Sequence, residues 1–133
     1  MPRGSAMRQQ GPDQGFSAAR RLRAPRLFAE AYSQDRRFRG RHMMLWLRKG
    51  TDAALRLGVV SSRKVGAAVQ RVRARRRLRE MFRRHRAELN GAVDLVLVAR
   101  ASLVLAPWAE VEADFLELMG KAGLWANAPG RQA

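Results

Sequence analysis

Arginine side chains gather in one short stretch of this chain, and their chemistry suits the binding of phosphate groups. Between Arg63 and Arg86 the sequence has eleven lysines and arginines and a single acid, Glu80. A guanidinium group is planar, stays charged and can donate two parallel hydrogen bonds to one phosphate. Arginines three and four residues apart on a helix repel one another unless a polyanion neutralises them. The stretch therefore predicts a nucleic-acid surface, with a solvated charged face, a membrane surface or an acidic protein partner as alternatives.

A helix over residues 71–86 would separate these arginines from a packing face. At about 100° per residue, one sector holds mainly apolar side chains and the opposite sector holds arginines. The first contains Ala74, Leu78, Met81, Phe82, His85 and Leu89, and the second contains Arg73, Arg76, Arg79, Arg83 and Arg84. Val69 and Val72 are out of phase, so we expect core contacts to begin near Ala74. Arg71 and Arg73 would lie near the helix N-terminus, whose backbone amides also attract phosphate.

The composition places this charge on a folded body. The 133 residues include 27 Lys and Arg against 11 Asp and Glu, a formal net charge of +16, and 47% are hydrophobic. That share is enough for one core, so we expect a single domain. Cysteine is absent, which excludes disulfides and thiolate metal sites and fits a reducing compartment. No apolar run could span a bilayer, so we expect a cytoplasmic protein without a membrane partner. No obligate protein partner is predicted.

Three regions are expected along the chain. Residues 1–20 combine Gly, Gln, Pro and Ser with few large apolar residues, which predicts a flexible basic extension. Residues 21–122 are expected to form one RNA-binding α/β domain. Residues 123–133 are expected to form a C-terminal tail.

Two further helices are expected, one near each end of this domain. The sequence PRLFAEAYSQ, residues 25–34, predicts a short helix that begins with proline and carries Phe28 and Tyr32 on one side. After Pro107, apolar residues recur at helical spacing as far as Gly120. This apolar stripe consists of Trp108, Val111, Phe115, Leu118 and Met119, and the acids Glu110, Glu112, Asp114 and Glu117 are expected to face outward.

Three strands are expected between the helices. Apolar runs at residues 42–47 and 54–61 flank a polar turn at residues 48–52, which predicts adjacent antiparallel strands. A third strand is expected at residues 92–100, after the basic helix. Together these elements predict an α+β fold, an α/β sandwich with a small mixed sheet of three to four strands and about three helices.

Residues for a protein-only nuclease are not grouped in the sequence. Such an enzyme needs clustered carboxylates for two metal ions, or a paired general acid and base. The two histidines, His42 at the start of a strand and His85 on the packing face of the basic helix, favour structural roles over a cleavage pair. The acids of the last helix are spread around it. We therefore expect no catalytic residue and no metal ligand in this chain.

The segment from Arg56 to Arg84, RLGVVSSRKVGAAVQRVRARRRLREMFRR, resembles the protein subunit of bacterial ribonuclease P. That family has a glycine, an Ala-Val pair, an Arg-Asn-Arg group, a basic pair and a final Arg-Glu. The matching residues, in the same spacing, are Gly66, Ala68 and Val69, Arg71 and Arg73, Arg75 and Arg76, and Arg79 and Glu80. The resemblance covers about residues 20–122. It departs from the family at Val72, where asparagine is usual, and at Ala67, where a polar residue is common.

The resemblance implies a protein cofactor of a ribozyme, part of an endoribonuclease that cuts precursor tRNA to form its mature 5′ end. The chemistry would lie on the RNA subunit, and Mg²⁺ would be bound mainly by that RNA. The family fold is an α/β sandwich with a left-handed β-α-β crossover, contrary to the usual preference. The partners implied are the ribonuclease P RNA subunit and precursor tRNA.

The same resemblance implies two RNA-binding regions. The catalytic RNA would be held by Arg71, Arg73, Arg75, Arg76 and Arg79. The single-stranded 5′ leader of precursor tRNA would lie in a cleft lined by Phe28, Tyr32, Trp46, Arg63 and Lys64. Flat side chains beside basic groups suit single-strand binding, because every base has a face to stack on. Residue types alone would instead place the three aromatic residues in the core and leave the two cations as solvated loop charges. The alternative function is a general RNA-binding or ribosome-associated protein.

Overall fold

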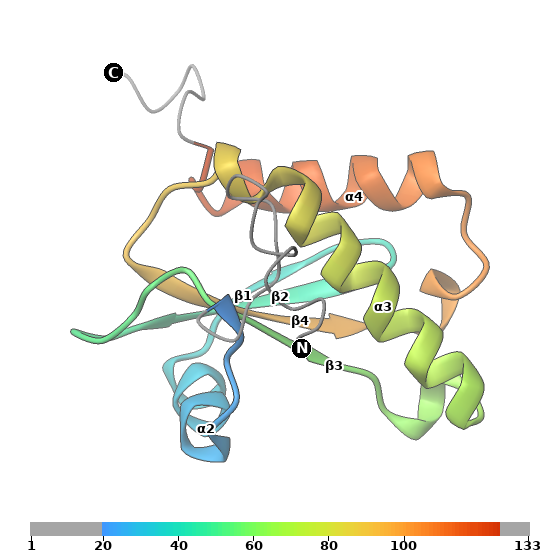
Figure 1. The fold of residues 1–133 in the computed structure, drawn as a ribbon, viewed down its shortest axis with the longest axis horizontal. Helices are drawn as coiled ribbons and strands as arrows, with labels where there is room; N and C mark the ends of the chain where they lie inside the picture. Colours follow the sequence, from blue (N-terminus) through green and yellow to red (C-terminus); the bar gives the residue numbers. More distant parts are fainter. Residues whose placement is uncertain (1–19, 126–133) are drawn as a thin grey trace, which may run out of the picture.

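A four-stranded mixed sheet separates one helix on one face from two helices on the other (Figure 1). The computed structural model describes residues 20–125. Its helices and strands are α2 (Pro25–Gln34), β1 (Arg36–Arg39), β2 (Met43–Lys49), β3 (Leu57–Val60), α3 (Ala68–His85), β4 (Val93–Ala99) and α4 (Trp108–Lys121). Short 3-10 turns lie at Arg63–Val65, Arg86–Glu88 and Ala101–Leu103. The predicted α+β fold is confirmed. The extension and most of the tail expected at the two ends lie outside the described residues.

The order of strands across the sheet is β1-β2-β4-β3. β1 pairs with β2, and β2 with β4, in antiparallel register, whereas β3 and β4 run parallel. Parallel neighbours need a crossover connection, and here α3 supplies it. This β3-α3-β4 unit is the one for which the family resemblance implies a left-handed connection.

The prediction that the first two apolar runs form adjacent strands is wrong. β4 lies between β2 and β3, with Leu45 paired to Leu97 and Val59 paired to the same Leu97 from the other side. The reason is burial: six of the seven residues of β4 are buried, so this strand needs a neighbour on each edge and a layer on each face. A hairpin of β2 and β3 would have left the most apolar strand at an edge.

β1 is a strand that the sequence pattern does not reveal. Its four residues read RRFR, and only Phe38 among them is partly buried. Phe38 pairs with Leu45 of β2, and the turn between the strands closes with a hydrogen bond from the Gly40 amide to the Met43 carbonyl, 2.8 Å long. One apolar residue in a charged tetrapeptide gives too little alternation to signal a strand.

The basic helix α3 begins at Ala68, three residues before the predicted start. Its packing face is as predicted, because Ala74, Leu78, Met81 and Phe82 are fully buried. The first turn lies beyond the edge of the core, which leaves Val69 74% exposed. The out-of-phase apolar residues therefore belong to a solvent-facing part of the helix.

The last helix corrects one further expectation. α4 packs by its predicted apolar stripe, and Val111 and Phe115 are fully buried. Asp114, however, does not face outward: it is 7% exposed, and its carboxylate accepts hydrogen bonds from the backbone amides of Arg41 and His42 at 2.8 and 2.7 Å. The aspartate thus anchors the β1–β2 turn to α4. Helical spacing alone gives no sign of such a tertiary acceptor.

Candidate RNA interface

Two exposed arginines of α3 have no partner in the described part of the chain. Arg73 and Arg76 are exposed, and their side chains form no hydrogen bond or ion pair within residues 20–125. Burial lowers the pKa of the neighbouring Arg77, and the charge of Arg73 lowers it further. The helix therefore carries an uncompensated positive field, which an anion would relieve.

Arg71 and Arg75 are tied to the end of β3 through one serine. Arg75 Nη1 donates to Ser61 Oγ at 2.8 Å, and Ser61 Oγ donates to the Arg71 carbonyl at 3.0 Å. Arg71 Nη1 also donates to the Gly66 carbonyl at 3.0 Å. A guanidinium group has five N–H donors, so each of these arginines keeps donors for a phosphate. The contacts hold the two side chains in fixed orientations at the start of the helix.

Arg79, one helical turn beyond Arg75, lines a hollow beside α2. The hollow has a volume of about 240 Å³, and Arg79 lines it together with Arg21, Phe28 and Gly58. Burial lowers the pKa of Arg79, and the charges of Arg21 and Arg75 lower it further. The structure thus places Arg79 between the two predicted RNA-binding regions, beside an aromatic residue assigned to the leader.

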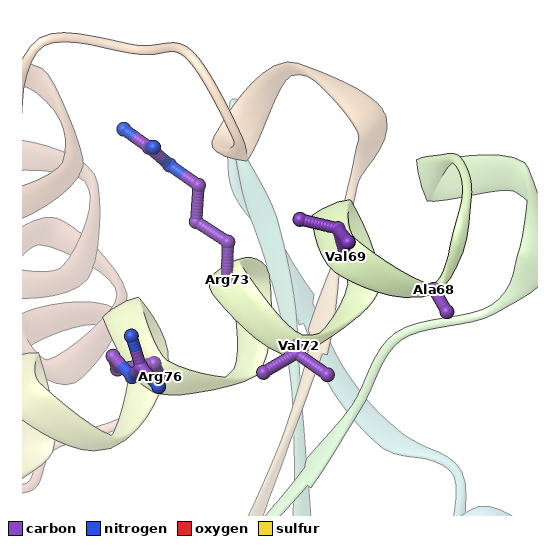
Figure 2. A pocket seen from close by; sticks show the side chains of 5 residues that line it. All are labelled: Ala68, Val69, Val72, Arg73 and Arg76. Carbon is purple, nitrogen blue, oxygen red and sulfur yellow. The ribbon is translucent and has the colours of Figure 1, made fainter.

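An open apolar hollow of about 440 Å³ adjoins the two unpartnered arginines on the first turns of α3. Ala68, Val69, Val72, Arg73 and Arg76 line it. Figure 2 shows Val69 and Arg73 projecting to one side of the helix, and Ala68 and Val72 to the other. Val72 is 44% exposed, so the residue that departs from the family asparagine stands on the surface and not in the core. It can make apolar contacts there but cannot offer an amide.

The three aromatic residues predicted for the leader lie on one face of the sheet. The Tyr32 and Trp46 rings meet edge to face, with centroids 5.0 Å apart. The Phe28 ring covers Gly58 of β3, at the other end of the same row of paired residues. Tyr32 is 38% exposed, and Phe28 and Trp46 are partly exposed. These side chains therefore pack on α2 and the sheet while keeping surface open to solvent.

Arg63 and Lys64 occupy the 3-10 turn that connects β3 to α3. Both side chains are exposed, and Ser62 Oγ accepts the Lys64 amide at 3.3 Å, which caps the turn. Val65, the third residue of the turn, is buried and fixes it to the core. The two cations therefore stand on the connection between the aromatic face and the basic helix.

A buried ion network holds α2 on the sheet beneath these aromatic residues. Arg48 of β2 is 3% exposed and donates to Asp94 of β4 at 2.8 Å, to Glu30 of α2 at 2.8 Å and to Asp52 at 2.7 Å. Arg56 donates to both carboxylate oxygens of Asp94, at 3.1 and 2.9 Å. Through Glu30 the network contributes to the position of α2, which also packs on the sheet by Leu27 and Ala31.

The network shifts the protonation equilibria of its members. The hydrogen bond to Asp52 is the main cause that raises the pKa of Arg48 above its ordinary value. Burial alone would raise the pKa of Asp94, but the hydrogen bonds from Arg56, two backbone amides and Arg48 outweigh it and lower the pKa. The sequence reading placed Arg48 in a polar turn, which is wrong. An aspartate inside the apolar run VDLVLVA was the available signal, since a buried carboxylate needs a cation.

Each of the two histidines contacts a different glutamate of α4. His42 Nδ1 lies 2.7 Å from Ser102 Oγ, and its Nε2 lies 3.1 Å from Glu110. His85 Nε2 lies 2.9 Å from Glu112. Glu110 and Glu112 are two positions apart on α4, which places them on nearly opposite sides of that helix. Within residues 20–125, no three His, Asp or Glu side chains converge as metal ligands would, and no helix is long and apolar enough to cross a membrane.

Comparison with known proteins relates this arrangement to one family. A family model described as Ribonuclease P matches residues 16–123. The ribonuclease P protein component of Coxiella burnetii is 40% identical over 107 residues, which cover 80% of this chain and 82% of that protein. The corresponding protein of Syntrophomonas wolfei is 31% identical over 107 residues, covering 80% of this chain and 90% of its own length.

Solved structures give the same result. The RNase P protein from Thermotoga maritima matches with a TM-score of 0.68 and 28% identity, covering 76% of this chain and 96% of that one. The RNase P protein of Staphylococcus aureus has the same fold, with a TM-score of 0.71 at 21% identity over 80% of this chain and 97% of that one. The resemblance first seen in the arginine-rich segment therefore extends over the whole described body. This chain belongs to the ribonuclease P family, and its role is that of the protein subunit of ribonuclease P.

Proposed function

We propose that this subunit holds the ribonuclease P RNA with the first turns of α3 and places the 5′ leader of precursor tRNA on the face between α2 and the sheet. The observation that carries the proposal is the pair Arg73 and Arg76, which stand exposed without a partner among the described residues. Arg71 and Arg75 adjoin them, with side chains oriented by hydrogen bonds to the Gly66 carbonyl and to Ser61 Oγ. Such preordered guanidinium groups bind phosphate with a smaller loss of side-chain entropy.

The aromatic face supports the second part of the proposal. Tyr32 and Trp46 present ring surface beside Arg37, whose guanidinium group lies 5.4 Å from the Trp46 ring centroid. Stacking on aromatic rings accepts any base, which suits leaders of varied sequence. Arg63 and Lys64, on the connection to α3, would bind the phosphates where the two RNAs meet.

We assign the cleavage chemistry to the RNA subunit. The acids at the core of the described residues are already engaged: Asp94 by two arginines and Asp114 by two backbone amides. No cluster of carboxylates converges there to hold two metal ions. The engagement of these acids supports placing Mg²⁺ mainly on RNA phosphates, where it would activate the attacking water.

Reconstitution tests the proposal directly. The purified chain, freed of nucleic acid, is added to a refolded bacterial ribonuclease P RNA at a magnesium concentration too low for the RNA alone. We expect cleavage of precursor tRNA at its mature 5′ end to be restored. No rescue with an RNA that is active alone at high magnesium would refute the proposal. Cleavage by the chain without any RNA subunit would refute the assignment of the chemistry.

A binding comparison separates this function from that of a general RNA-binding module. Such a module would share the basic helix but would have no use for the aromatic face. The reconstituted complex should bind precursor tRNA more tightly than mature tRNA, because only the precursor has a leader. Equal affinities would favour the general module.

A further inference from the structure

The edge strand β1 carries two arginines that the register places on the aromatic face of the sheet. Arg37 pairs with Trp46 across the β1–β2 ladder, and Arg39 pairs with Met44. Residues directly opposite in a ladder point to the same face, so both arginines lie on the side covered by α2. Arg36 pairs with Leu47, a residue of the main core, and therefore points to the other face.

Each of the two arginines continues a row that runs across the sheet. The first row passes from Arg37 through Trp46 and Val96 to Gly58, where Phe28 lies over it. The second row, of Arg39, Met44, Val98 and Val60, runs beside the first. Its three apolar residues are only partly buried, so α2 does not close this row off. This face of the sheet is thus largely apolar, with guanidinium groups along its β1 edge.

The contacts of the two arginines leave them able to bind an anion. Arg37 lies over the Trp46 ring and forms an ion pair with Asp35, Nε to Oδ1 3.3 Å, with both side chains more than half exposed. Arg39 is exposed and has no hydrogen-bond or ion-pair partner within residues 20–125. Two residues of a strand span about 6.6 Å, so the two guanidinium groups can reach successive phosphates of an extended strand.

We propose that Arg37 and Arg39 form a second phosphate-binding edge, which holds the leader of precursor tRNA where it passes beyond the aromatic residues. The inference rests on the proposed function, because it assumes that the leader occupies this face. A base stacked on Trp46 would bring its own phosphate next to Arg37, and the following nucleotide would lie over Met44 and beside Arg39. With this edge, the protein contacts more nucleotides of the leader than Phe28, Tyr32 and Trp46 contact alone.

Asp35 competes with the leader for Arg37. It ends α2 in the left-handed conformation, with φ 54°, and its amide donates to the Tyr32 carbonyl at 3.2 Å. Asparagine also tolerates this conformation, so Asp35→Asn keeps the turn while removing the charge. The variant should bind the leader more tightly, because Arg37 loses its anionic partner and the local potential becomes more positive.

The test measures equilibrium binding of the reconstituted complex to precursor tRNAs over a range of salt concentrations. For a long-leader precursor, Arg37→Gln combined with Arg39→Gln should reduce affinity and lower the slope of log K against log salt by about 1.4, at roughly 0.7 per single-strand phosphate. A precursor with a one-nucleotide leader and mature tRNA should bind the double variant as they bind the wild type. Arg36→Gln, a change in charge on the same strand but the opposite face, is the matched control and should bind every RNA like the wild type.

Three results would overturn the proposal while leaving the proposed function intact. They are an unchanged affinity of the double variant for the long leader, an equal loss for mature tRNA, and an equal loss in Arg36→Gln. A wild-type complex that binds precursor and mature tRNA equally would overturn the proposed function as well. Circular dichroism and thermal unfolding of each variant establish that the fold is retained, and tighter binding by Asp35→Asn supports the proposal independently of any loss of function.

Discussion

Arg48 and Asp94 stand opposite each other on β2 and β4 and form an ion pair, Nη1 to Oδ2 2.8 Å, with side chains only 3% and 0% exposed. The pair lies on the face covered by α2, and Arg48 reaches from it to Glu30 of that helix. This interior charge pair therefore helps to hold α2 on the sheet, together with the buried Leu27 and Ala31 of that helix. Removing Asp94 breaks the fully buried part of the network: Arg48 keeps Glu30 and Asp52 as partners, while Arg56 loses its carboxylate.

Asp94→Asn should destabilise the fold by about 3–5 kcal/mol, the usual cost of breaking a buried pair. The folded-state pKa of Asp94 is lowered from 3.8, so its contribution is fully present above that value and is lost as the pH falls through the folded-state pKa. The stability of Asp94→Asn should therefore fall less than that of the wild type as the pH is lowered. Urea denaturation at neutral and acidic pH measures both effects. Glu117→Gln, an exposed acid paired with Lys121 at 3.6 Å, serves as the control, and an equal loss there would contradict the prediction.

Gly58→Ala should displace the Phe28 ring. A Cβ atom at position 58 would stand 2.5 Å from Phe28 Cζ, closer than atoms can approach. We expect a loss of roughly 1–3 kcal/mol in stability, typical of overpacking, together with weaker binding of precursor tRNA. Thermal unfolding and the affinities for precursor and mature tRNA measure the two effects. Gly120→Ala, where the nearest atoms lie 3.7 Å away, is the matched substitution: it should leave tRNA binding unchanged and should not lower stability, because alanine is the better helix former within α4.

Val72→Asn should tighten binding to the ribonuclease P RNA. The side chain is 44% exposed, and valine and asparagine have similar helix propensities, so stability should hardly change. One added hydrogen bond of about 1 kcal/mol corresponds to roughly a fivefold gain in affinity. Filter binding at fixed salt provides the measurement. Val69→Asn, 74% exposed in the same hollow, should give no gain, and equal behaviour of the two variants would argue against a specific amide site.

Arg76→Gln should affect RNA binding and Arg77→Gln should affect stability, although the two residues are adjacent. Arg76 is unpartnered among the described residues, so its loss should spare stability and lower the salt slope of RNA binding by about 0.9 for a duplex phosphate. Arg77 Nη1 donates to the carbonyls of Leu103 and Val104 at 2.6 and 3.1 Å. Its loss should cost about 1–3 kcal/mol in the free energy of unfolding. Salt titrations of RNA binding and urea denaturation of both variants measure these effects. Equal stability losses in the two variants would contradict the prediction.

Local patterns in the sequence predicted the helices well. α2 begins at Pro25 and ends at Gln34 as expected, because a proline in the first turn and i, i+4 apolar pairs are properties of the helix itself. The packing face of α3 followed from its period for the same reason. The arginines predicted to hold RNA are exposed or partly exposed there, although only RNA binding can test their role.

Relations between distant segments could not be predicted in this way. The neighbours of β2 depend on which strand is buried on both faces, and that is a property of the assembled sheet. Asp114 reads as a surface acid until the β1–β2 turn is brought against α4. Arg48 and Asp94 are 46 residues apart, and nothing local marks them as partners. Arg37 lies on the aromatic face only because of the register of β1, a strand that the sequence pattern does not predict.

The position of β4 constrains how the chain folds. It is the last strand among residues 20–125, yet it pairs with both β2 and β3 inside the sheet (Figure 1). Until residues 93–99 leave the ribosome, the nascent chain can form the β1–β2 hairpin and local helices, but β3 lacks the strand with which it forms a ladder. Such non-local pairing slows folding relative to a helical bundle, because loop entropy is lost before contacts form. The basic segment therefore emerges from the ribosome before the core that will support it exists.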